Sequence, residues 1–269
     1  AKSAIGFVFG MVIYMFIFMY GIMVMRGVLE EKTSRIVEVM VSSVKPFQLM
    51  LGKIIGIALV GLTQFCTWVL LSFILMLFVQ GSLMPDMYDA ANVAGGGVGT
   101  EMVAENIKDQ VPDAEQGLPN EFIQDLLNAE WGLMIGLFLF YFIGGYLLYA
   151  SLFAAVGSAV DSETETQQFM LPITLPLIFG MIVSMMAAFN PGGSAIVWLS
   201  HIPLTSPIAM LVRVAMGDYV WWELLISMVT LVITFILTTK MAGKIYRTGI
   251  LMYGKKASWR ELLRWLRYK

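Results

Sequence analysis

The sequence predicts an all-α, polytopic membrane protein with about five membrane-spanning helices. Of its 269 residues, 58% are apolar and only 13% are charged, whereas about a quarter of a soluble domain is charged. Five separate stretches are long and apolar enough to cross the ~30 Å hydrocarbon core of a bilayer as helices. These stretches lack the alternation of a barrel strand, and a helix satisfies its own backbone hydrogen bonds in lipid.

The predicted spans follow one another along the chain with short and long connections. They lie near residues 4–25, 54–79, 133–156, 170–189 and 222–241. Charged residues occur only at their edges, where Glu223 and Lys240 lie near the interfaces. We therefore expect a multi-pass protein whose principal partner is the lipid bilayer.

Basic residues near span ends predict the orientation. Fourteen of the 17 lie in two places: Arg26, Lys32, Arg35, Lys45 and Lys53 between the first two spans, and Lys240, Lys244, Arg247, Lys255, Lys256, Arg260, Arg264, Arg267 and Lys269 at the C-terminal end. Both places are therefore predicted to be cytoplasmic, including a basic tail at residues 243–269. Residues 80–130 contain ten acids and one basic residue, Lys108, and form a predicted acidic, extracytoplasmic loop. Five spans then place Ala1 outside, so we expect one further span upstream.

A short amphipathic helix is predicted at residues 30–46, between the first two spans. Its apolar face contains Ile36, Val37, Met40, Val41 and Val44, and its opposite face contains Glu31, Arg35, Glu38 and Ser42. One interpretation is a plain interfacial helix with its charges in water. Because the charged face carries both signs, docking to a protein partner is favoured over binding to anionic lipid.

Two further segments are predicted to lie at the membrane surface. The tail places Trp259, Leu262, Leu263 and Leu266 in an apolar stripe among basic residues, which predicts an amphipathic helix on anionic cytoplasmic lipid. Residues 203–216, on the outer side, are too few to span the bilayer. Because this segment contains Arg213, we expect it to lie at the interface or to dip partway into the membrane.

Several motifs together resemble one transporter family. Residues 30–53 combine an acidic and basic helix with Gly52-Lys53 at the start of the next span. Thr166-Gln167-Gln168 precedes a span containing Pro172 and Pro176, and Ile202-Pro203-Leu204-Thr205-Ser206-Pro207 precedes Arg213 and the last span. This series resembles the permease subunits of type-2 ATP-binding-cassette (ABC-2) exporters, in their sodium- or drug-efflux-like branch. One departure is that the family's Ser-Pro-Val turn reads Ser43-Val44 here, with proline at Pro46.

The resemblance implies that residues 30–44 form a coupling helix that docks into a groove of a separate ABC ATPase subunit. The candidate coupling residues are Glu30, Glu31, Arg35, Glu38 and Lys45. It also implies a dimer with a second permease copy or homologue, an upstream span with an external domain, and a location in the cell membrane of a bacterium. This chain has no complete phosphate-binding signature, since Gly27 to Thr33 lacks the second glycine. We therefore expect ATP and Mg on the partner ATPase, and no catalytic residue, cofactor or metal in this chain.

Polar residues inside the spans are candidates for the substrate path. These are Thr63, Gln64, Thr67 and Ser184, although structural hydroxyl groups also occur in spans. The spans lack the buried Asp, Glu, Lys or His pairs of an ion-driven relay, which favours an externally powered transporter. Sodium, a drug, a peptide and a lipid-linked molecule all remain open as substrates. Nucleic acid is not expected as a partner, because the basic residues cluster beside the spans.

Two other functions are alternatives to an exporter permease. Glu30-Glu31-x-x-x-Arg35 resembles the glutamate pair of CAAX-type intramembrane proteases, which also need histidines from other spans. The chain has one histidine, His201, predicted on the outer side and beyond hydrogen-bond reach of Glu30. A membrane scaffold that does not transport is the other alternative.

Overall fold

The computed structural model describes residues 2–34, 44–82, 131–187 and 192–250, together with Met252 and Glu261. These residues form seven helices and, within the described part of the chain, no strand. The helices are α1 (Lys2–Thr33), α3 (Pro46–Ser82), α7 (Trp131–Ala159), α8 (Glu163–Ala187), α9 (Ser194–His201), α10 (Ser206–Met216) and α11 (Trp221–Gly249). By their contacts, Ala1–Leu59 and Asn128–Lys269 form one compact unit, unit 1, and Val60–Leu127 form a second, unit 2.

Five of these helices are long and apolar enough to cross a membrane: α1, α3, α7, α8 and α11. They overlap all five ranges predicted from the sequence, of which residues 188–189 lie outside the described residues. The prediction of an all-α membrane protein with about five spans is confirmed. Each helix begins before its predicted range, and α1, α3, α7 and α11 also end after it. At its C-terminal end, α1 continues through Glu30 to Thr33.

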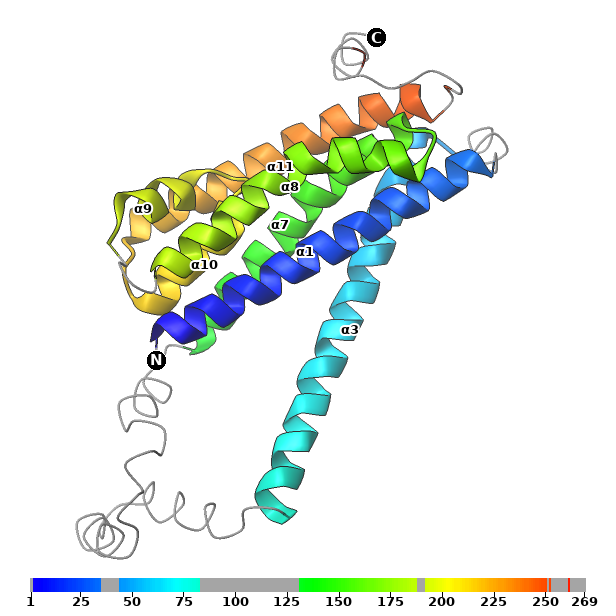
Figure 1. Ribbon diagram of the computed structural model, residues 1–269. Coiled ribbons are helices and arrows are strands. Elements are labelled where there is room, and N and C mark those ends of the chain that lie inside the picture. Colours follow the sequence, from blue (N-terminus) through cyan, green and yellow to red (C-terminus); the bar gives the residue numbers. More distant parts are fainter. Residues whose placement is uncertain are drawn as a thin grey trace, which may run out of the picture. The chain divides into compact units, whose positions relative to one another are not determined.

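Helix α7 is the central helix of unit 1. It contacts α1, α11, α10 and α8, and Figure 1 shows it running between α1 and α11. Its aromatic side chains at Tyr141, Tyr149 and Phe153 are fully buried. Small residues let neighbouring backbones approach: a Cβ added to Gly157 would lie 2.5 Å from the Met25 carbonyl oxygen of α1.

The first turns of α1 pack against α10. A Cβ added to Gly6 would lie 3.0 Å from Ala215 Cβ, and one added to Gly10 would lie 3.1 Å from Val212 Cγ2. Two glycines one turn apart therefore create the close contact between these helices, as small residues do at helix interfaces in membranes.

Helix α10, which was expected to lie at the interface or to dip partway into the membrane, is covered by the neighbouring helices of unit 1. Every residue from Ser206 to Ala215 is buried, and α10 contacts α1, α7, α8 and α9. It ends at Gly217, whose φ of 76° is left-handed and whose N–H donates to Arg213 and Val214 carbonyls. The shortness of α10 indicated a surface helix, but its apolar residues are covered by neighbouring helices. Helix α9 had no counterpart in the sequence-based prediction.

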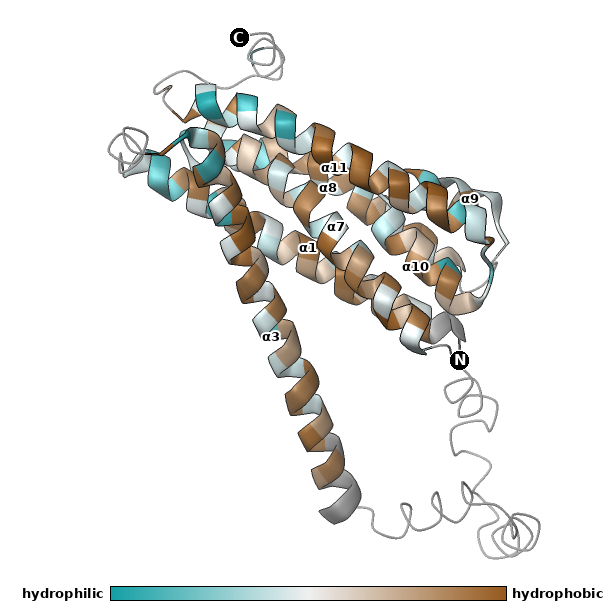
Figure 2. Cartoon of the chain, turned by 180° about the vertical axis from the view of Figure 1, so that it is seen from behind, coloured by the Kyte–Doolittle hydropathy of each residue, from teal (hydrophilic) through white to brown (hydrophobic). Residues whose placement is uncertain are grey.

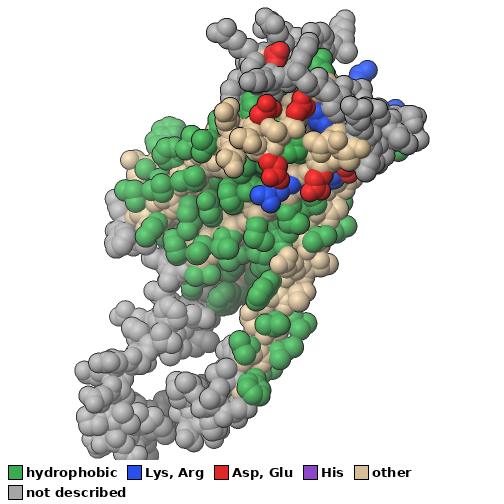
Figure 3. Space-filling view, turned by 45° about the vertical axis from the view of Figure 1, so that its right-hand side comes forward, with side chains coloured by type: hydrophobic (Ala, Val, Ile, Leu, Met, Phe, Trp, Pro, Cys, Tyr) green, Lys and Arg blue, Asp and Glu red, His purple; other side chains and the backbone are tan. Residues whose placement is uncertain are grey.

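Charged residues gather at one end of unit 1. Figure 2 shows α1 and α11 with hydrophobic middles and with hydrophilic residues toward their C-terminal ends. In Figure 3, acidic and basic side chains gather beside a broad hydrophobic surface. Large hydrophobic side chains such as Leu171, Phe179 and Leu225 are exposed in unit 1 and suit contact with lipid. The charged end is the one that the basic residues predict to be cytoplasmic.

Candidate functional site

The last turn of α1 contains three consecutive charged residues with different surroundings. Glu30 is exposed, Glu31 is half-buried, and Lys32 is 1% exposed. Helix α1 runs unbroken from Lys2 to Thr33, so Glu30 and Glu31 lie on α1 rather than at the start of a separate helix. Any movement of the chain just after α1 therefore acts directly on a membrane-spanning helix.

Lys32 ties α1 to the turn between α7 and α8. Its Nζ lies 2.8 Å from Asp161 Oδ1 as an ion pair and donates a hydrogen bond of 2.9 Å to the Ser158 carbonyl oxygen. A buried cation without a partner costs several kcal/mol by order of magnitude. Asp161 and the Ser158 carbonyl together meet that requirement, and Lys32 in turn holds the end of α7 against α1.

The position of Asp161 is fixed by the start of α8. Ser162 precedes the helix, and its Oγ accepts a hydrogen bond of 3.4 Å from the Glu165 N–H. The Glu165 carboxylate in turn accepts a hydrogen bond of 3.4 Å from the Asp161 N–H. This reciprocal arrangement is similar to a capping box. It differs in that the Glu165 carboxylate accepts its hydrogen bond from the N–H of Asp161 and not from the N–H of Ser162. The short connection between two spans is thereby ordered beside Lys32.

Lys53 ties α1 to the start of α3. Its Nζ lies 2.7 Å from Glu31 Oε1 and donates a hydrogen bond of 2.5 Å to the Gly27 carbonyl oxygen. Both side chains are partly exposed, so the pair contributes less energy than a buried one. A Cβ added to Gly27 would lie 3.1 Å from Lys53 Nζ, so the missing side chain leaves room for the lysine.

The predicted coupling residues are only partly placed. Glu30 and Glu31 lie on α1, and Lys45 is an exposed residue directly before α3. Arg35 and Glu38 lie outside the described residues, as does the rest of the predicted helix at residues 35–43. The described residues on either side of that segment are brought together by Lys53 and Glu31. Lys32, Lys53 and Asp161 were not among the predicted site residues. Their signal in the sequence was a charge placed directly beside an uncharged span.

The four candidate path residues form two separate groups. Thr63, Gln64 and Thr67 lie on α3 in unit 2, and Ser184 lies on α8 in unit 1. The hydroxyls of Thr63 and Thr67 donate to the carbonyl oxygens of Val60 and Thr63, both at 2.8 Å. Ser184 is buried and donates a hydrogen bond of 2.6 Å to the Gly180 carbonyl oxygen. Each of these hydroxyl groups donates to a backbone carbonyl oxygen of its own helix, and a role in the substrate path remains a prediction.

A second polar cluster lies at the other end of unit 1. The buried Arg213 of α10 forms an ion pair of 2.7 Å between Nη2 and Glu223 Oε2, and its Nη1 donates a hydrogen bond of 2.9 Å to Ser200 Oγ. The Tyr141 hydroxyl donates to Ser227 Oγ at 2.9 Å, and Ser227 Oγ donates to the Ser200 carbonyl oxygen at 2.8 Å. This cluster joins α7, α9, α10 and α11, and it explains how an arginine is accommodated inside the protein.

The arrangement of His201 does not fit the protease alternative. His201 ends α9, its Nδ1 lies 2.7 Å from the Val197 carbonyl oxygen, and its ring centroid lies 6.3 Å from that of Trp222. Figure 1 shows α9 at the end of unit 1 opposite the C-terminal end of α1, which contains Glu30. Among the described residues, no group of three His, Cys, Asp or Glu could hold a metal ion.

Comparisons with known proteins identify one family model and two relatives. A family model described as "ABC-2 family transporter protein" matches residues 1–244. The uncharacterized protein YhaP of Bacillus subtilis (strain 168) is 29% identical over 256 residues, which are 95% of this chain and 53% of that protein. The uncharacterized protein MJ1024 of Methanocaldococcus jannaschii is 23% identical over 260 residues, which are 97% of this chain and 52% of that protein. The chain thus spans about half the length of these curated relatives. No solved structure matches the chain.

Proposed function

The chain belongs to the ABC-2 family of transporter proteins, and from this premise we propose that it is the membrane-spanning permease part of an ATP-driven exporter. A separate ABC ATPase subunit binds ATP and Mg and hydrolyses the ATP. Two permeases form a dimer, and substrate crosses outward between them. The family match and the five apolar helices support this proposal.

The observation that carries the proposal is the pair of ionic contacts at the end of α1. Lys32 contacts Asp161 before α8, and Glu31 contacts Lys53 in α3. Glu31 and Lys32 are among the first residues of the segment predicted to dock the ATPase, residues 30–44. A force applied to that segment would therefore act on α1, on the start of α3 and on the turn between α7 and α8 together.

The mechanism follows from the stiffness of these contacts. Packed helices with ionic and hydrogen-bonded contacts have discrete arrangements rather than continuous ones. When ATP binding brings the two ATPase subunits together, they push on residues 30–45. Helix α1 then moves together with the start of α3 and the turn between α7 and α8. In this scheme Glu30, Arg35, Glu38 and Lys45 contact the ATPase, while Lys32, Lys53 and Asp161 pass the movement to the spans.

The test uses the full-length protein with its ATPase in lipid nanodiscs. The double variant Lys32→Met with Asp161→Leu removes both charges and leaves no unpaired buried ion. We expect it to bind the ATPase normally, while ATP hydrolysis falls toward the rate of the ATPase alone. Glu163→Gln, an exposed acid two residues from Asp161, is the control and should keep wild-type coupling. If the full-length protein purifies without any ABC ATPase and supports no ATP-dependent transport, the proposed function is wrong.

A further inference from the structure

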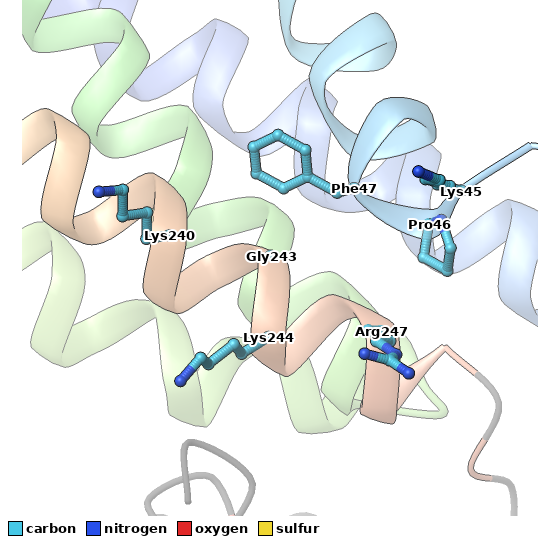
Figure 4. A pocket seen from close by; sticks show the side chains of 7 residues that line it. All are labelled: Lys45, Pro46, Phe47, Lys240, Gly243, Lys244 and Arg247. Atoms are coloured by element: carbon cyan, nitrogen blue, oxygen red, sulfur yellow. The ribbon is translucent and has the colours of Figure 1, made fainter. Parts of the chain in front are cut away.

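A basic pocket lies between the start of α3 and the end of α11, both within unit 1. It has a volume of about 640 Å³ and is lined by Lys45, Pro46, Phe47, Lys240, Gly243, Lys244 and Arg247. Four of these seven residues are cationic and none is acidic. Figure 4 shows Phe47 directed toward α11 near Gly243 and Arg247 opposite Pro46, whereas the Lys240 and Lys244 side chains extend from the other side of α11 in this view.

The cations on α11 share one face of the helix. Lys240, Lys244 and Arg247 are spaced by four and three residues, which places them one above the other. All three are exposed, and in the part of the chain that the structure describes neither they nor Lys45 form an ion pair. Like charges at this spacing repel one another. The start of α3 adds the positive end of a helix dipole. An anion would relieve this repulsion.

The same face of α11 becomes apolar toward the middle of the span. Leu237 and Ile233 precede Lys240 by three and seven residues, and both are exposed large hydrophobic residues. The stripe therefore changes from apolar to basic at Lys240. A ligand that follows it needs an anionic end and a hydrocarbon end.

The pocket has a hydrophobic wall built by close packing. A Cβ added to Gly243 would lie 2.5 Å from Phe47 Cδ2, so the aromatic ring lies directly on the α11 backbone. Phe47 is still 41% exposed and offers an apolar surface beside the cations. Its position depends on the absence of a side chain at Gly243.

We propose that this pocket binds the phosphate headgroup of an anionic phospholipid from the cytoplasmic leaflet. The phosphate lies among Lys240, Lys244 and Arg247, and an acyl chain follows Leu237 and Ile233 into the membrane. Basic pockets between spans on the cytoplasmic side are suited to anionic headgroups. A free phosphate would satisfy the cations but would leave the apolar stripe and Phe47 without a role. The site is independent of ATP hydrolysis and of the proposed docking of an ATPase.

The test measures lipid selectivity of the full-length protein by electron spin resonance. Spin-labelled phosphatidylglycerol and phosphatidylcholine give a ratio of association constants, and the wild type should prefer the anionic lipid. The variant with Lys240, Lys244 and Arg247 changed to Gln loses three of the four cations that line the pocket and should lose most of this preference. The matched control changes Arg26, Lys255 and Lys256 to Gln, which removes the same charge from residues that are not among the seven named as lining the pocket.

The control is expected to keep the preference of the wild type, and an equal loss in both variants would overturn the pocket as the site. A charge-neutral variant, Gly243→Ala, forces the Phe47 ring to move and should also lower the preference. Gly136→Ala, at a position with no atom within 4 Å of the added Cβ, should not. Displacement of the anionic lipid by inorganic phosphate would show a free-phosphate site instead and would overturn the proposal.

Discussion

Lys32 Nζ lies 2.8 Å from Asp161 Oδ1, so a cation at the end of α1 is paired with a carboxylate between α7 and α8. Lys32 is 1% exposed, whereas the Asp161 side chain is 30% exposed. The buried Lys32 ammonium therefore relies on Asp161 and on the Ser158 carbonyl to replace its contacts with water, whereas water still reaches the Asp161 carboxylate. The contact joins segments from distant parts of the sequence at the end of unit 1 where the ATPase is proposed to dock.

Removing the carboxylate should destabilise the protein. Asp161→Asn removes the carboxylate that forms the ion pair with buried Lys32, and breaking a buried pair typically costs ~3–5 kcal/mol. We expect a value at or below the lower end of that range, because water reaches Asp161. Glu163→Gln, an exposed change in the same connection, should alter stability by less than ~0.5 kcal/mol. Unfolding in a denaturing detergent series compares the two, and equal stabilities would contradict the structural role of the pair.

The two acids beside Arg213 should differ in importance. Glu223 Oε2 lies 2.7 Å from the guanidinium and its side chain is 13% exposed, whereas Asp218 Oδ2 lies 3.9 Å away and its side chain is 44% exposed. Glu223→Gln should therefore cost ~3 kcal/mol or more by leaving a buried charge, and Asp218→Asn ~1 kcal/mol or less. Thermal unfolding of the two variants in the same detergent measures this order. A larger effect of Asp218→Asn would show that Glu223 is not the counter-ion.

The five spans could be predicted because each is a long run without charge. The helix ends could not be predicted in the same way. The charges at Glu30, Glu31 and Lys32 look like the end of a span, but α1 continues through them to Thr33. Glu31 contacts Lys53, and Lys32 contacts Asp161. These partners lie far along the chain, and a single sequence carries no signal that pairs them.

The end of unit 1 that contains Arg213 shows the same limit. Arg213 within a short apolar segment indicated a helix at the interface or one that dips partway into the membrane, because a lone charge is costly inside a membrane protein. The structure instead provides Glu223 and Ser200 as partners, and α10 is buried. The candidate path was the least predictable part, since Thr63, Thr67 and Ser184 donate to carbonyls of their own helices. Such bonds are common for hydroxyl groups in any helix.

The predicted orientation can be tested with single cysteines. Gly97→Cys and Lys256→Cys, each in a Cys66→Ala background, place one thiol in the acidic loop and one in the basic tail. We expect a membrane-impermeant maleimide to label Gly97→Cys in intact cells and Lys256→Cys only after permeabilisation. Labelling of both from outside would overturn the five-span topology.

The protein alone should neither bind nor hydrolyse ATP. This sequence has no complete glycine-rich phosphate loop, and the proposed function assigns the nucleotide site to a separate ABC ATPase subunit. Phosphate release by the purified full-length protein should equal the background, and it should rise when an ABC ATPase is added. Stoichiometric turnover in a preparation free of ABC ATPase would remove the exporter proposal in its present form.

The central claim is that residues 30–45 dock an ATPase, and the most direct measurement is the affinity of the full-length protein for that ATPase. Glu38→Arg reverses a charge on the predicted docking face, and Arg35→Glu reverses the opposite sign one turn earlier. Losing a partner of a desolvated interfacial pair costs ~2–5 kcal/mol of binding, whereas an exposed pair is worth ~1 kcal/mol or less. We predict that both variants insert and fold normally but lose ATPase association and transport. Wild-type affinity in both Glu38→Arg and Arg35→Glu would contradict the docking of this segment.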